Sequence, residues 1–238
     1  MKKLFTFLAV AAACLACQKN ETIALDNGEA ISFGNAFVEN AVRANDPSYG
    51  AVALTKFNVW GTVDASNGNP VAIFAGDEVT GTVGVGSTWK CTSKTQYWIN
   101  GAKYNFAALV NAGTVNLGTD LLPATVAFES DGSTDLLYAK SDEYTGKPPG
   151  ENVKVAFTFH HLLSKVYIKV TNNSAAATGY SFLVKDIKIN APKTAGSYDI
   201  ATSKWTAATA GDYTFNNINA AMKKAIVLRM AAYNPCEG

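Results

Sequence analysis

The chain has 238 residues, a formal net charge of +1 and 16% charged residues. This balance, with no basic run beyond the first residues, argues against nucleic acid as a partner. With 48% hydrophobic residues and 19 glycines, the sequence can bury the core of one or two domains and supply many turns.

The first residues have the features of a bacterial lipoprotein signal. Lys2 and Lys3 precede an apolar run over residues 4–13. That run is too short for a transmembrane helix, which needs about 20 apolar residues. Two cysteines follow, Cys14 and Cys17, and an alanine precedes each of them. Small residues before the cysteine that takes the lipid are typical of such a signal.

Cys17 is the predicted lipidation site, because a polar run over residues 18–21 begins directly behind it. We assign residues 1–17 to the signal peptide and residues 18–30 to a polar tether. An ordinary cleaved signal peptide with an incidental cysteine is the alternative.

An alternating segment follows the tether. Ile31, Phe33 and Phe37 share one parity, which predicts a strand over residues 31–38. The polar, proline-containing stretch around Arg43 then predicts an exposed loop.

Further strands are predicted by the same kind of pattern. Phe57, Val59 and Val63 mark one strand, residues 71–75 a buried strand and residues 104–108 another. Glycine, asparagine and proline separate these segments. The pattern therefore favours an all-β fold.

Three aromatic residues, Trp89, Tyr97 and Trp98, lie close together in this part of the chain. Aromatic residues on strands usually pack in the core or against a neighbouring strand. A carbohydrate-binding platform made of these three side chains is the alternative.

A short acidic segment has the spacing of a calcium-binding loop. Asp131, Ser133 and Asp135 match its first positions. However, Leu136 stands where the sharp turn needs glycine, and Asp142 stands where a bidentate glutamate is needed. A plain acidic turn is the favoured interpretation, and no metal or cofactor is predicted.

The clearest strands follow a proline- and glycine-rich spacer. After this spacer, every second residue is apolar over residues 153–159 and again over residues 166–170. Proline and glycine in the spacer cannot continue a strand ladder. We therefore predict a domain boundary there, with a first domain over residues 31–145 and a second over residues 146–238.

The sequence DLLYA at residues 135–139, the spacer and the alternating segment come in an order that resembles the fimbrillin family of Bacteroidetes. This family comprises the type V pilins with their anchor and tip relatives. The aromatic pattern over residues 89–108 is similar to the family as well. The resemblance implies a lipoprotein exposed on the outer membrane or in a fimbrium, and we expect two Greek-key β-sandwich domains in tandem.

The resemblance also implies an assembly mechanism. An arginine-specific protease removes an N-terminal strand, and a strand from another fimbrial subunit fills the vacated groove. A sandwich that lacks a strand exposes backbone groups and core, and an incoming strand satisfies both. Here Arg43 is the predicted cleavage site, and residues 31–38 are the strand that leaves. An anchor protein of the family would instead keep its lipid and stay uncut.

The last third of the chain follows the pattern less closely. Residues 196–205 predict a hairpin, and Tyr213 and Phe215 begin another strand. Residues 220–230 have a pattern more typical of a helix. We expect the second sandwich to be incomplete, with the resemblance extending to about residue 218.

No catalytic constellation is apparent. His160 and His161 are adjacent on a predicted strand, so their side chains point to opposite faces, and we expect His160 to be partly buried at the domain junction. Cys91 has no histidine near it in sequence, and the nucleophile and metal-protease motifs are lacking. The sequence therefore predicts a protein that is not an enzyme.

Two functional hypotheses remain. One is a structural or adhesive fimbrial subunit whose partners are other subunits, the outer membrane through its lipid, the protease, and host proteins or glycans. The other is a surface lipoprotein that binds glycans through exposed aromatics. Burial of the aromatic side chains discriminates between them; the relevant residues are Trp60, Trp89, Tyr97, Trp98 and Trp205.

Overall fold

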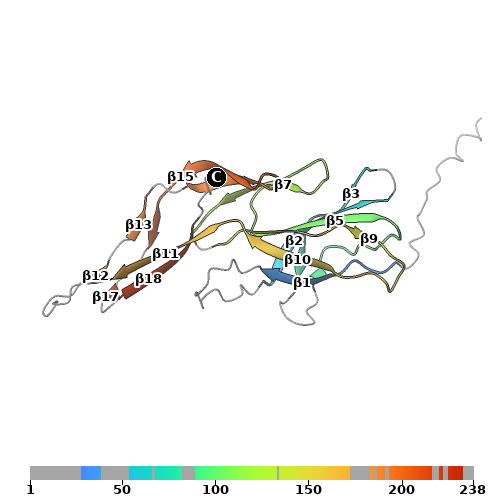
Figure 1. Ribbon diagram of the computed structural model, residues 1–238, viewed down its shortest axis with the longest axis horizontal. Helices are drawn as coiled ribbons and strands as arrows, with labels where there is room; N and C mark the ends of the chain where they lie inside the picture. The colour runs from blue at the N-terminus through green and yellow to red at the C-terminus, as the bar shows by residue number, and fades with distance from the viewer. Residues whose placement is uncertain are drawn as a thin grey trace, which may run out of the picture.

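The protein is described by a computed structural model in which the predicted all-β class is confirmed (Figure 1). Within the described part every regular element is a strand. No helix there is long and apolar enough to cross a membrane. The description covers residues 28–38, 54–65, 68–81, 89–132, 134–171, 183–184, 187–190, 193–215, 220–221 and 225–232.

The larger sheet has eight strands, and its order runs from β1 at one end to β4 at the other. β9 pairs with β5 beside this path. In sheet order the strands are β1 (Phe33–Val38), β10 (Val155–His161), β8 (Leu137–Lys140), β5 (Lys103–Val110), β2 (Lys56–Asp64), β3 (Val71–Thr80) and β4 (Lys90–Cys91), with β9 (Tyr144–Thr145) alongside.

Two cores cover opposite faces of β2 and β5. Alternation along a strand sends neighbouring side chains to opposite faces, and on β5 both Phe106 and Ala107 are buried. The aromatic core includes Phe33, Phe57, Phe74, Trp89, Trp98, Tyr104, Phe106, Phe157 and Phe159. The second core consists of Trp60, Ala107, Leu109, Leu122, Val126 and Leu136.

A second sheet of four strands covers the second core. Its order is β15 (Lys204–Ala210), β14 (Lys193–Asp199), β7 (Pro123–Glu129) and β6 (Val115–Leu117). The antiparallel β14–β15 pair confirms the predicted hairpin. The predicted domain boundary lies between residues 145 and 146. β14, which follows it, pairs with β7, which precedes it, and β10 likewise pairs with β8 in the larger sheet. Each sheet therefore contains strands from both predicted domains. Division into tandem domains at that point stays a prediction.

The remaining strands form pairs towards the other end of the molecule from β3 and β5 (Figure 1). They are β11 (Ser164–Thr171) with β18 (Ala225–Ala232), β12 (Leu183–Val184) with β17 (Ala220–Ala221), and β13 (Ile187–Ile189) with β16 (Tyr213–Phe215).

The helix predicted over residues 220–230 is wrong. Alanine, leucine and methionine give this segment a helical propensity, but propensity is a weak prior. β18 instead pairs with β11 along its whole length, from Ala225 opposite Thr171 to Ala232 opposite Ser164. Tertiary pairing has overridden the local preference.

The alternation predicted for β10 is confirmed, because Val155, Phe157 and Phe159 are buried while the residues between them are exposed. Val153 is the exception: it precedes the strand and is 61% exposed. Residues 71–75 form the start of β3 as predicted, but the prediction that they are buried is wrong. Only Phe74 of these five residues is buried, and Val71 is 62% exposed.

Candidate functional site: the seat of the first strand

β1 is the feature on which the sequence hypotheses depend. It runs parallel to β10, with Phe33 opposite Val155 and Val38 opposite Phe159 (Figure 1). The carbonyl of Ser32 accepts a hydrogen bond from the Val155 N–H at 2.9 Å. The predicted strand over residues 31–38 is therefore present, and its ladder with β10 begins at Phe33.

On the opposite side, the start of β1 and the residues just before it contact a different segment, residues 89–98. Antiparallel bridges join Ala30 to Tyr97 and Phe33 to Trp89. The Ile31 N–H donates to the Gln96 carbonyl at 2.8 Å, and the Trp98 N–H donates to the Glu29 carbonyl at 3.0 Å. The last two residues of the predicted tether, Glu29 and Ala30, and the following Ile31 are thus tied into the fold by backbone pairing.

These contacts close the larger sheet on itself. Trp89 directly precedes β4, which lies at the far end of the sheet from β1. The Phe33–Trp89 bridge therefore joins the two ends. We call the position of β1 between β10 and residues 89–98 the β1 seat.

Phe33 occupies the centre of this seat and is 1% exposed. Its ring lies 5.6 Å from that of Phe74, 6.1 Å from those of Phe57 and Phe157, and 6.3 Å from that of Phe106. These neighbours come from β3, β2, β10 and β5. One side chain of β1 thus fills a space that four other strands surround.

The residue after Phe33, Gly34, lies close to the side chain of Lys154. A Cβ atom added at Gly34 would lie 3.0 Å from Cδ and 3.1 Å from Cβ of Lys154. The register with β10 shifts between Gly34 and Ala36, which indicates a bulge, and Ala36 is 3% exposed. Small residues therefore stand where β1 passes closest to its neighbour.

Glu29 fastens the start of this segment to the loop before β10. Its carboxylate accepts hydrogen bonds from the Gly150 N–H at 2.8 Å and from the Asn152 side chain at 3.2 Å. The amide of Asn152 also donates to the Lys147 carbonyl at 2.9 Å, which holds the loop in shape. The hydrogen bond from Gly150, followed by that from the Asn152 side chain, lowers the pKa of Glu29.

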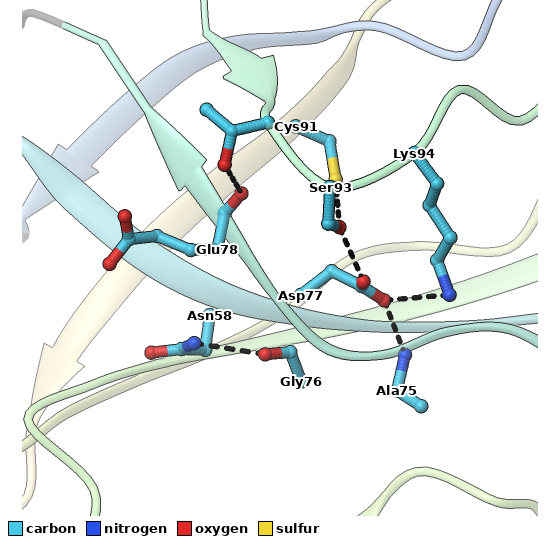
Figure 2. Close-up of polar contacts among 9 residues, drawn as sticks. Asn58, Ala75, Gly76, Asp77, Glu78, Cys91, Ser93 and Lys94 are labelled. Atoms are coloured by element: carbon cyan, nitrogen blue, oxygen red, sulfur yellow. Dashed lines mark hydrogen bonds and ion pairs between the residues drawn. The ribbon is translucent and has the colours of Figure 1, made fainter.

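Asp77 fixes the other wall of the seat (Figure 2). This β3 residue accepts hydrogen bonds from the Ser93 hydroxyl at 2.6 Å and the Ala75 N–H at 2.9 Å, and it pairs with Lys94 at 2.8 Å. Burial acts to raise the pKa of Asp77, but the hydrogen bonds from Lys94, Ser93 and Ala75 outweigh it, so the pKa lies below its ordinary value. The segment that pairs with β1 is thus tied to β3.

The Asp77 network also reaches Cys91, whose thiol lies 3.4 Å from the Ser93 hydroxyl (Figure 2). Cys91 is free and partly exposed. The two consecutive histidines, His160 and His161, are on a different strand, β10. Cys91 also packs, partly buried, against the aromatic core, so the described contacts give it a packing role.

The three predicted glycan contacts do not form an exposed platform. Trp89 is 1% exposed and Trp98 is 6% exposed, whereas Tyr97 is 39% exposed. The Trp98 ring packs 4.6 Å from that of Tyr104, whose hydroxyl accepts a hydrogen bond from the Ile99 N–H at 2.6 Å. Both indole side chains therefore pack in the aromatic core, as aromatic residues usually do.

The acidic turn also departs from a calcium site. The Asp131 carboxylate accepts hydrogen bonds from both the N–H and the hydroxyl of Thr134, each at 2.6 Å. Asp135 instead pairs with His161. Within the described ranges, no group of three or more His, Cys, Asp or Glu side chains is placed to hold a metal ion.

The expectation for the histidines is corrected. His160 is exposed on β10, and His161 is the partly buried one, facing Asp135. The register explains this: Phe159 points into the aromatic core, so His160 points out and His161 turns back towards the segment before β8.

Several predicted site residues lie outside the described residues. They include Cys17 and Arg43, as well as the side chain of Phe37, whose backbone belongs to β1. Conversely, sequence reasoning missed Glu29 and the Asp77 network. Asp77 reaches Ser93, 16 residues away, and Glu29 reaches Gly150 and Asn152, 121 and 123 residues away, and no local pattern marks such contacts.

The architecture defines the class: a two-sheet β protein whose larger sheet is closed by its first strand. A family model described as fimbrillin-like matches residues 43–232. The chain therefore belongs to the fimbrillin-like family. The match includes the tail beyond residue 218, where the sequence resemblance was expected to end, and it begins after β1.

Two solved structures are similar to this chain, and the first supports its fold. One is a "putative cell adhesion protein" from Bacteroides uniformis, with a TM-score of 0.53 and 16% identity, covering 87% of this chain and 75% of that one. Another, with the same description, is from Bacteroides ovatus, with a TM-score of 0.46 and 18% identity over 85% of this chain and 78% of that one. No curated protein matches the sequence.

Proposed function

We propose that this chain is the precursor of a surface-exposed structural or adhesive subunit of a fimbria. A lipid on Cys17 anchors the precursor in the outer membrane, and the subunit is assembled by exchange of β1. In this proposal an arginine-specific protease cuts after Arg43. The cut frees residues 1–43 from the rest of the chain, and a strand from another subunit then takes the β1 seat.

The observation that carries the proposal is the position of β1. It closes the larger sheet through a ladder with β10 on one side and, on the other, through bridges and hydrogen bonds of residues 29–33 to residues 89–98. Loss of residues 29–38 would expose the backbone groups of β10 together with the rings around Phe33. Unpaired strand edges and exposed core attract another strand, and added strands bind through these groups.

Membership of the fimbrillin-like family supports the same role and favours a structural protein over an enzyme. The burial of Trp89 and Trp98 weighs against the glycan-binding alternative, which needs them on the surface. The partners that follow from the proposal are other fimbrial subunits, the protease and the membrane.

Cleavage provides the main test. The full chain is incubated with an arginine-specific protease, the new N-terminus is sequenced, and assembly is followed by size-exclusion chromatography. We expect a fragment that starts at Ala44 and oligomers that are lost in Arg43→Ala. Arg229→Ala is the matched control, because Arg229 is paired with Tyr167 in the β11–β18 ladder, where a protease has poor access.

Two results would contradict polymerisation. The folded chain could resist cleavage at Arg43, or the cut protein could stay monomeric with β1 still in place. Either result favours an uncut anchor or adhesin.

The lipid is tested separately by metabolic labelling with a palmitate analogue. Cys17→Ser should lose the label and Cys14→Ser should keep it. The reverse pattern would move the lipid to Cys14.

A further inference from the structure

We propose that the β1 seat selects its incoming strand by two adjacent positions: a large aromatic residue where Phe33 stands, and glycine or alanine directly after it. This inference rests on the proposed strand exchange. It identifies the partner segment by its chemistry, as one that contains an aromatic–small pair like Phe33 and Gly34.

The first position is set by the space that Phe33 fills. Phe57, Phe74, Phe106 and Phe157 surround it, and each is at most 1% exposed. Three of the rings belong to β2, β3 and β5, which stay paired without β1 through β2–β3 and β2–β5, and β10 keeps its link to β5 through β8. The three walls from β2, β3 and β5 therefore remain, and only a ring of similar size restores their contacts.

The second position is set by Lys154. A side chain after the aromatic residue meets Lys154 at 3.0 Å from its Cδ and 3.1 Å from its Cβ. The Cδ end can swing away, whereas the Cβ moves only with the backbone of the residue before β10. Alanine thus needs a small adjustment, and a β-branched residue needs the start of β10 to shift.

Backbone pairing alone cannot select one incoming strand sequence over another. Hydrogen bonds of the Ser32–Val155 kind form with any incoming sequence, so they add affinity without discrimination. Ser32 itself is only partly buried, which makes its side chain a neutral position for comparison.

The test uses the full chain with a recognition site for a sequence-specific protease placed at residue 43. After the cut, fluorescent peptides spanning residues 28–40 compete with the resident strand. Anisotropy measures their binding, and size-exclusion chromatography measures release of residues 1–43. The second readout separates true replacement from binding elsewhere.

We expect the unchanged peptide and the Ser32→Ala control to bind within about threefold of each other, since surface changes have small effects. The Phe33→Ala peptide should bind about a hundredfold more weakly or worse, because a buried ring is lost. The Gly34→Val peptide should bind about tenfold more weakly, and Gly34→Ala should lie between.

The failures are distinguishable. Equal binding of the unchanged and Phe33→Ala peptides overturns the aromatic rule while strand exchange stands. Equal binding of Gly34→Val overturns the rule for the small residue. If even the unchanged peptide never releases residues 1–43, strand exchange itself fails, and the selection rule fails with it.

Discussion

The two cores on opposite faces of β2 and β5 are closed in different ways. β1 closes the aromatic core as a single strand near the start of the chain. The second core is covered by four strands, two of which come from residues 193–210. A cover made of one strand can be lost in one step, whereas a cover shared by a sheet comes away only when the sheet does.

The comparison makes Phe33 the most sensitive position of the aromatic core. Phe33→Ala should lower the free energy of unfolding by about 3–5 kcal/mol, because it removes a buried ring and leaves a cavity. Urea denaturation measures the loss. Hydrogen exchange should show reduced protection over residues 28–38 beyond the global change.

Leu136→Ala in the second core is the matched control, with an expected loss of about 2–5 kcal/mol. Protection of residues 28–38 should then change no more than the rest of the larger sheet. If both variants affect the same segments equally, the two covers are not independent.

Overfilling the aromatic core gives the next effect. A Cβ at Gly61 would lie 2.7 Å from Cδ1 of Phe106 and 3.0 Å from Cδ2 of Phe74. Gly61→Ala should therefore cost about 1–3 kcal/mol in urea denaturation. Val71→Ala, at an exposed position on neighbouring β3, should cost under about 0.5 kcal/mol. A neutral Gly61→Ala would mean that the rings move aside.

The wall of the β1 seat formed by residues 89–98 is tested at Asp77. Asp77→Ala removes the acceptor for Ser93 and Ala75 and the partner of Lys94, and it should cost about 1–3 kcal/mol. Glu78→Ala is the control, because its pair with Lys56 is exposed and such pairs contribute about 0–1 kcal/mol. Equal losses in thermal unfolding would show that Asp77 does not hold this wall.

The smallest effect is expected at Glu29 and depends on pH. Its pKa is lowered in the fold, so its stabilising contribution is present above the ordinary value of 4.5 and is lost as the pH falls through the lowered pKa. Protection of residues 28–31 should fall in acid in the unchanged protein. In Glu29→Gln that fall should be absent, because glutamine has no charge to lose. The same acid profile in both proteins would place the cause elsewhere.

Alternation and composition were enough to predict those parts of the fold that depend on local sequence. The buried positions of β10 and the strand over residues 31–38 follow from a period of two. The sequence could not predict that β1 lies between β10 and residues 89–98, since pairing over such separations depends on the whole fold. The aromatic residues illustrate the limit: the pattern left Trp89 open to either the core or the surface, and only the closed sheet decided.

The tail shows a second limit. Residues 225–232 contain residues that favour helices, and their partner strand lies more than 50 residues earlier. Glu29 shows a third, because its hydrogen bonds to Gly150 and Asn152 span 121 and 123 residues. Contacts of this kind leave no periodic signal in the chain.

The position of β1 has a mechanical consequence. A pull along the axis of a strand loads all of its hydrogen bonds together, whereas a pull across the strand breaks them one after another. The β1 seat offers a ladder with β10, bridges to residues 89–98 at the start of the strand, and space for a buried ring. If subunits exchange β1 as proposed, axial tension on a fibre would load the β10 ladder as a whole, and the subunit joint would resist extension more than peeling.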